Sequence, residues 1–276
     1  MISDLHSRYA DEVAALSGAK SSVLRRALAT VRREDFLPPG PWVIEALNGE
    51  YYPSDDADPR HVLHAVGVAI DVERTLNNAN PLRFAEQMKV VEPQPGETVF
   101  HVGAGLGYYS AVLAEMVAPT GRVLAAEIDP GLRERARANL SGCPGVELIG
   151  DALTATLPPI DILYSSAGLG TLPLSWLSAL KPGGRMVLPI TDANDHGLIF
   201  VFRKIEEGRP WAARILSFTR HYPCLGTRET GNLSAISTAL TQAPARVASL
   251  VLGRHDKDES CWLHGEGWCL SMKAPA

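Results

Sequence analysis

The chain has 276 residues, of which 46% are hydrophobic and 21% are charged, so we expect a globular protein with a substantial core. Its net charge is −5 and its Lys and Arg residues cluster only in pairs such as Arg25–Arg26, which predicts no nucleic-acid partner. No stretch approaches the roughly 20 apolar residues of a membrane span, and the N-terminus lacks a basic, apolar leader. We therefore expect no membrane association and a cytoplasmic location.

Residues 1–92 are predicted to form an N-terminal helical cap that contributes to acceptor binding. The stretch "SSVLRRALATVRREDFLPP" has apolar residues at positions 23, 24, 27, 28 and 31, a Ser pair suited to capping and a Pro-Pro stop. We expect a cap or lid here and no separate sheet domain.

Strand and helix patterns alternate in residues 93–220. Strands are expected in "ETVFHVG", "GRVLAAEID", "GVELIGD", "PIDILYSSAG" and "GGRMVLPI", and helices in "YYSAVLAEMVA", "PGLRERARANL" and "PLSWLSALKPGG". This alternation predicts a doubly wound α/β fold with a parallel sheet. The pair "DHGLIFVFRK" and "GRPWAARILSF" predicts an antiparallel hairpin, and residues 221–276 are expected to form a C-terminal extension packed on this core.

Three glycines at every second position, Gly103, Gly105 and Gly107, join the first of these strands to its helix. Such a loop exposes backbone N–H groups to a ligand at the carboxyl end of the strand. The dinucleotide fingerprint would require a glycine where Tyr108 stands, so the spacing suits a cofactor without a pyrophosphate. We predict S-adenosylmethionine, with S-adenosylhomocysteine as product, and keep an NAD(P) enzyme as the alternative.

Two carboxylates extend this predicted cofactor site. Glu127 ends the second strand, where it can accept hydrogen bonds from ribose hydroxyls, and Asp151 follows the third, where it can accept from the adenine amine. The predicted cofactor-binding residues are His101, Gly103, Ala104, Gly105, Gly107, Tyr108, Glu127, Ile128, Asp151 and Ala152.

Several of these stretches together resemble the protein-L-isoaspartate O-methyltransferases. The resemblance covers roughly residues 20–205 and rests on "VRREDFLPP", "PGETVFHVGAGLGYYSAVLAEMV", "GRVLAAEID", "IDILYSSAG" and "LKPGGRMVLPI". It implies a Rossmann-like class I methyltransferase with a seven-stranded, mostly parallel sheet and a reversed terminal strand. It also implies an O-methyltransferase activity.

The segment that would receive the methyl acceptor departs from this family. Members that repair isoaspartate carry Thr-Ile-Ser-x-Pro, whereas this chain has Asn77, Asn78 and Ala79 in those positions and so lacks the Ser hydroxyl. The leading hypothesis is therefore an O-methyltransferase acting on a carboxylate or hydroxyl of a small metabolite or a modified peptide. The alternatives are genuine isoaspartate repair and a non-catalytic protein that binds S-adenosylmethionine.

The candidate catalytic residues are Asn77, Asn78, Ala79 and His101, all on the acceptor side. His101 stands where the family commonly has an acidic residue, and its alternative is a packed strand residue. His221 is a further candidate base.

The four cysteines are Cys143, Cys224, Cys261 and Cys269. With His255 and His264, the last two could form a zinc site, but they lack paired Cys-x-x-Cys spacing. The expectation is packed, reduced thiols and no metal.

Overall fold

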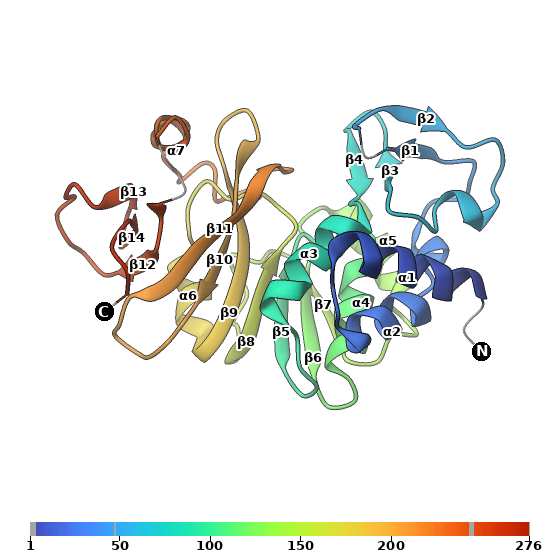
Figure 1. Ribbon diagram of the computed structural model, residues 1–276, viewed down its shortest axis with the longest axis horizontal. Helices are drawn as coiled ribbons and strands as arrows, with labels where there is room; N and C mark the ends of the chain where they lie inside the picture. Colours follow the sequence, from blue (N-terminus) through green and yellow to red (C-terminus); the bar gives the residue numbers. More distant parts are fainter. Residues whose placement is uncertain (1–3, 47, 243–245, 276) are drawn as a thin grey trace. The chain divides into compact units, whose positions relative to one another are not determined.

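The computed structural model describes residues 4–46, 48–242 and 246–275 and divides into two compact units (Figure 1). The first unit comprises Met1–Gly96 and Ala104–Leu148, and the second comprises Glu97–Gly103 and Ile149–Ala276. The units thus alternate along the chain. The two units do not coincide with the predicted stretches 1–92, 93–220 and 221–276. The boundaries of those stretches stay a prediction.

The first unit combines helices with short strands. Its elements are α1 (Asp4–Ser17), α2 (Ser22–Thr30), η1 (Arg33–Phe36), β1 (Val43–Glu45), β2 (Tyr51–Pro53), η2 (Pro59–His61), β3 (Gly67–Asp71), β4 (Leu76–Asn78), α3 (Pro81–Val91), α4 (Tyr108–Val117), β6 (Arg122–Ala126), α5 (Pro130–Asn139) and β7 (Val146–Ile149), whose last residue is assigned to the second unit. Helix α1 packs against α2 and α3, and α2 packs against α4 (Figure 1).

Side-chain caps set where three of these helices begin. The side chains of Ser21, Asn80 and Asp129 accept hydrogen bonds from backbone N–H groups in the first turns of α2, α3 and α5. A proline follows the cap in α3 and α5, where its missing N–H is not needed. The predicted Ser cap of α2 and the proline start of α5 are confirmed.

Residues 43–78 correct the prediction of a wholly helical cap. They form a four-stranded antiparallel sheet in the order β2-β1-β3-β4. Trp42, Ile44, Val62 and Val68 make a small apolar core for it. The sequence did not predict this sheet because each strand has only three to five residues, too few to establish an alternating pattern.

The second unit is built on long strands. Its elements are β5 (Thr98–Val102), β8 (Ile160–Ser165), α6 (Leu174–Ala179), β9 (Leu180–Thr191), β10 (His196–Arg203), β11 (Trp211–Arg220), α7 (Leu233–Leu240), β12 (Ser249–Leu252), β13 (Cys261–Gly265) and β14 (Trp268–Ser271). The strand order within this unit is β13-β14-β12-β11-β10-β9-β8-β5. None of the helices within the described ranges of the chain is long and apolar enough to cross a membrane.

The α/β fold class is confirmed, but the sheet differs from the seven-stranded one expected. In this unit β8 runs parallel to β5 and β9, whereas the pairs from β9 through β13 are antiparallel. The β10–β11 hairpin is as predicted. Strands β12 to β14 extend the sheet from the Gly-, Ser- and His-rich residues 249–271, whose short strands give no clear periodic pattern.

Candidate functional site

The glycine loop (residues 103–107) has left-handed backbone at each glycine. In the first unit, Gly105 has φ +57° and Gly107 has φ +92°. A Cβ on Gly107 would lie 2.9 Å from Leu140 Cδ1, whereas a Cβ on Gly105 would meet nothing within 4 Å. Gly107 is therefore required for packing, and Gly105 faces open space into which a ligand can fit.

The Glu127 carboxylate holds this loop in place by hydrogen bonding to its backbone. Its side chain is 6% exposed, and its Oε2 and Oε1 accept hydrogen bonds from the backbone N–H groups of Gly105 (2.7 Å) and Asp129 (3.0 Å). Burial raises the pKa of Glu127, and the two backbone hydrogen bonds oppose that shift. A carboxylate has about four lone-pair sites, so it retains capacity for ribose hydroxyls.

The neighbours of Gly105 and Glu127 also suit a nucleoside. Ile128 is 42% exposed, and such an apolar side chain beside the carboxylate can cover the face of a base. Ala104 is buried and its backbone N–H donates to the carbonyl of Ala126 at 3.0 Å, which holds the loop against β6. The open space at Gly105 and the buried carboxylate fit an adenosyl cofactor.

Three further predicted cofactor residues lie in the second unit. Gly103 directly follows β5 with φ +78°, and its Cβ position lies 3.4 Å from the Ala167 Cβ. Asp151 Oδ1 accepts from the Leu153 N–H at 2.8 Å, which leaves carboxylate capacity for an exocyclic amine. The carbonyl of buried Ala152 accepts from the Trp176 indole at 2.9 Å. The structure therefore brings Gly105 and Glu127 into direct contact within the first unit. Gly103, Asp151 and Ala152 belong to the second unit, and their part in cofactor binding stays a prediction.

The two candidate bases are histidines of the second unit. His101 is 1% exposed, and its Nε2 lies 3.0 Å from Ser166 Oγ. Burial lowers the pKa of His101 to about 3 and that of His221 to about 4, so both are neutral and weakly basic near neutral pH. The contacts of His101 agree with the alternative of a packed strand residue.

The predicted acceptor segment (residues 77–79) is held by polar contacts inside the first unit. Asn77 Nδ2 donates to Glu45 Oε2 at 2.7 Å, and Asn78 Oδ1 accepts from Arg33 Nε at 3.0 Å. The Ala79 carbonyl accepts a hydrogen bond from the Tyr109 hydroxyl and a longer one, 3.4 Å, from Arg33. The segment therefore has a defined backbone position although it lacks the Ser hydroxyl.

Arg33 is a buried cation whose contacts with the predicted acceptor segment the sequence did not reveal. Its side chain is fully buried, and its guanidinium also donates to the carbonyls of Val62 and Val66, both at 2.8 Å. One cation thus joins the stretch before β3 to the acceptor segment. Arg33 and its neighbour Arg32 look alike in the sequence, yet the side chain of Arg32 is 60% exposed. The only signal was the occurrence of both in the family-like stretch "VRREDFLPP".

The two tyrosines after the glycine loop pack inside the first unit. The Tyr108 hydroxyl lies 2.9 Å from that of Tyr9, and Arg33 Cζ lies 5.9 Å from the centre of the Tyr108 ring. Burial raises the pKa of Tyr108 well above its usual range. Tyr109 stacks on Phe84 with ring centres 4.4 Å apart. Tyr108 thus borders Arg33, and its predicted contact with the cofactor stays a prediction.

Comparison with known proteins identifies similar sequences and folds. The profile of the protein-L-isoaspartate(D-aspartate) O-methyltransferase family matches residues 17–219. A protein-L-isoaspartate O-methyltransferase of Methanopyrus kandleri is 32% identical over 208 residues, which cover 73% of this chain and 83% of that protein.

Two solved structures share the fold. A protein-L-isoaspartate O-methyltransferase has a TM-score of 0.67 at 23% identity, covering 84% of this chain and 69% of its own. A structure from Plasmodium falciparum, named as a beta-aspartate methyltransferase in complex with S-adenosyl-L-homocysteine, has a TM-score of 0.61 at 13% identity. It covers 79% of this chain and 97% of its own. The matched range of the family profile contains Arg33, the acceptor segment, the glycine loop and Glu127.

Proposed function

Because the chain belongs to the protein-L-isoaspartate O-methyltransferase family and is an S-adenosylmethionine-dependent O-methyltransferase, we propose that its acceptor is the free carboxylate of an isoaspartyl residue in a peptide. The observation that carries this proposal is the family match over residues 17–219, which includes the acceptor segment. The leading hypothesis from the sequence named a small metabolite or a modified peptide, and the small-metabolite part of it finds no support in these comparisons. The family assignment also replaces the hypothesis of a non-catalytic binding protein.

The weak bases of the chain are consistent with this acceptor. S-adenosylmethionine supplies a methyl group on a positively charged sulfur. An ionised carboxylate is already a nucleophile, so transfer to it requires positioning and no general base. The low pKa values of His101 and His221 therefore do not impede the reaction.

The cofactor is proposed to rest on the glycine loop. Gly105 leaves room for it, and Glu127 accepts from its ribose hydroxyls while Ile128 covers the base. Asp151, in the second unit, keeps lone pairs for an exocyclic amine, and its contact with the cofactor stays the prediction made from the sequence. These assignments are those expected from the sequence.

Asn78 is proposed to replace the family Ser as a donor to the acceptor carboxylate. Arg33 Nε fixes the amide oxygen of Asn78, and this orientation defines its NH₂ group as the donor end of the side chain. Asn78 is 8% exposed, so a hydrogen bond from it to a carboxylate would be largely shielded from water. The missing hydroxyl at Ala79 is then no obstacle to isoaspartate methylation.

The test is transfer of labelled methyl from S-adenosylmethionine to an isoaspartyl peptide and to the matching aspartyl peptide. We expect transfer to the isoaspartyl form alone, with release of labelled methanol in mild base because the product is a methyl ester. Absence of transfer from protein that binds the cofactor would contradict the proposed acceptor.

A second variant tests the donor. Asn78→Asp keeps the shape and gives Arg33 a carboxylate partner, but it places a negative charge against the acceptor. We expect the KM for the isoaspartyl peptide to rise about tenfold or more, with cofactor affinity unchanged. Asn194→Asp, at an exposed turn, is the matched control. An unchanged KM for Asn78→Asp would remove Asn78 from the proposal.

A further inference from the structure

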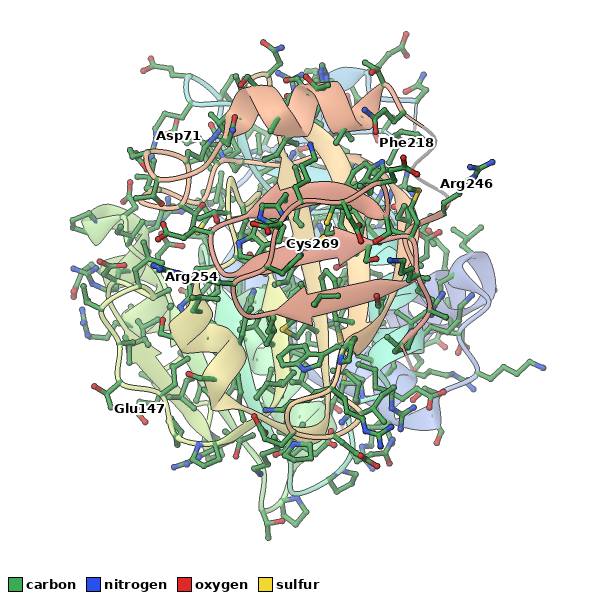
Figure 2. All side chains as sticks on the ribbon, turned by 90° about the vertical axis from the view of Figure 1, so that its left-hand side faces the viewer. Asp71, Glu147, Phe218, Arg246, Arg254 and Cys269 are labelled. Atoms are coloured by element: carbon green, nitrogen blue, oxygen red, sulfur yellow. The ribbon has the colours of Figure 1, made fainter. Side chains whose placement is uncertain are left out.

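The C-terminal strands bring together four side chains that are scattered in the sequence. His255 lies between β12 and β13, Cys261 and His264 belong to β13, and Cys269 belongs to β14. One ligand atom from each lies within 4.8 Å of all the others. Figure 2 labels Cys269 on these strands, which face the viewer. We propose that His255, Cys261, His264 and Cys269 bind a zinc ion.

A β-bulge explains why Cys261 and His264 share a side of their strand. Residues three apart on a regular strand point to opposite faces. The β13–β14 register shifts between Cys261 and Leu263, which compensates for the odd spacing. His264 then pairs directly with Cys269 on β14. The sequence showed the four residues but not the bulge, so their spacing did not predict a metal site.

The distances suit tetrahedral coordination. Zinc bonds of about 2.3 Å to sulfur and about 2.0 Å to nitrogen place neighbouring ligand atoms roughly 3.3 to 3.8 Å apart. His255 Nε2 lies 3.7 Å from Cys261 Sγ. The widest pair, at up to 4.8 Å, must close by roughly 1 Å, which rotation of side chains at a strand end permits.

The ring nitrogens of the two histidines give independent support. His255 Nδ1 lies 3.1 Å from the Gly253 carbonyl, and a hydrogen bond there directs the lone pair of Nε2 toward Cys261. Histidine ligands of metals generally have such a backbone or carboxylate partner. His264 Nδ1 is buried without a hydrogen-bond partner, which is costly unless a cation occupies that position.

The two thiols are more buried than the histidines. Cys261 is 9% exposed and Cys269 is not exposed at all, while His255 lies at the surface. A bound cation would hold both sulfurs as thiolates, since metal coordination deprotonates thiols.

The ligand set specifies zinc and a structural role. Two thiolates with two imidazoles in a tetrahedron are typical of zinc. Four protein ligands leave no position for substrate, so the ion would act as a cross-link. It would join the stretch before β13 to the β13–β14 hairpin, whose turn already accepts a hydrogen bond from the Gly253 N–H at the Gly267 carbonyl (2.9 Å). Such cross-links stabilise small elements whose own core is limited.

The first test is the metal content of the full chain purified without chelators. We expect about one zinc per chain, released when the thiols are titrated with an organic mercurial. Cys269→Ser and His264→Gln should each lower the bound zinc, whereas Cys143→Ser and the exposed His196→Gln should leave it unchanged. Zinc retained by both cluster variants would overturn the assignment.

A cobalt titration covers the case in which the variants do not fold. Metal-free wild-type protein, reduced and then titrated with Co²⁺, should develop the visible bands of tetrahedral cobalt together with thiolate-to-cobalt charge transfer. Saturation at about one equivalent is expected. Absence of these bands with both thiols reduced would overturn the proposal. So would a Cys261–Cys269 disulfide in peptide maps of the freshly purified protein.

Discussion

Two regions of the first unit, residues 104–107 of the glycine loop and the acceptor segment, are fixed in different ways. Gly105 of the loop is held by Glu127, 22 residues away at the end of the next strand. The acceptor segment is held by Arg33, which lies 45 residues from Asn78 and 46 from Ala79. The cofactor side is therefore set by neighbouring elements of a common fold. The acceptor side is held by residues farther away along the chain: Arg33 contacts both Asn78 and Ala79, and Glu45 and Tyr109 add one hydrogen bond each. We expect substitutions to separate the two.

Removing the Arg33 cation should have the largest effect. Arg33→Met leaves the buried carbonyls of Val62 and Val66 without their donor, so we expect the free energy of unfolding to fall by about 3 kcal/mol or more. Urea denaturation measures it. Arg32→Met is the matched control and should cost less than about 1 kcal/mol, because that side chain is 60% exposed. Equal losses for the two would show that the acceptor segment does not depend on Arg33.

A substitution at Gly105 is expected to weaken cofactor binding and to leave the acceptor segment in place. Gly105→Val places a branched side chain at φ +57° in open space, so we expect the Kd for S-adenosylhomocysteine to rise about a hundredfold, or about 2.8 kcal/mol. Calorimetric titration measures this. Gly208→Val, at φ +74° with nothing within 4 Å of its Cβ position, tests for backbone strain alone. An unchanged Kd at Gly105→Val would remove the cofactor from the loop.

Glu127 links cofactor binding to pH. Because burial raises the pKa of Glu127, its ionisation costs stability. That cost is absent below the unfolded value near 4.5 and complete above the raised folded value. Cofactor affinity should change in the opposite sense and fall as pH drops through the raised pKa, because the protonated oxygen then faces an N–H donor.

Glu127→Gln is the variant that isolates this effect. It should lower cofactor affinity by about 1.5 to 3 kcal/mol and give a flat profile over the acidic range. Titrations of the wild type and variant across pH measure both features. A flat wild-type profile would contradict the role of the carboxylate.

The smallest effect is expected at Tyr109. Tyr109→Phe removes the hydroxyl that donates to the Ala79 carbonyl, while the longer bond from Arg33 remains. We expect about 1 kcal/mol of lost stability and a higher KM for the isoaspartyl peptide at an unchanged cofactor Kd. Tyr52→Phe, on the exposed strand β2, is the control. A change in cofactor Kd alone would assign Tyr109 to the other region.

The difference between local and distant contacts explains which features the sequence predicted and which it did not. Glycine spacing and a carboxylate at a strand end follow from local geometry, and the structure joins Gly105 to Glu127 in the first unit. Arg33 could not be distinguished from Arg32, since burial depends on partners 29 to 46 residues away. The three-residue strands of the small sheet are too short for a periodic pattern to be detected in the sequence. The bulge in β13 shifts the strand register by pairing with β14, which the sequence pattern does not show.

The position of Arg33 also bears on how the chain acquires its structure. During synthesis Arg33 emerges before every oxygen that it contacts, and the last, on Ala79, follows 46 residues later. Until then its charge remains hydrated, and the helix that precedes it can form from local contacts alone. Non-local contacts of this kind slow folding, because the intervening loop must close before they contribute. We therefore expect the acceptor segment to order late, after α1 and α2 have paired.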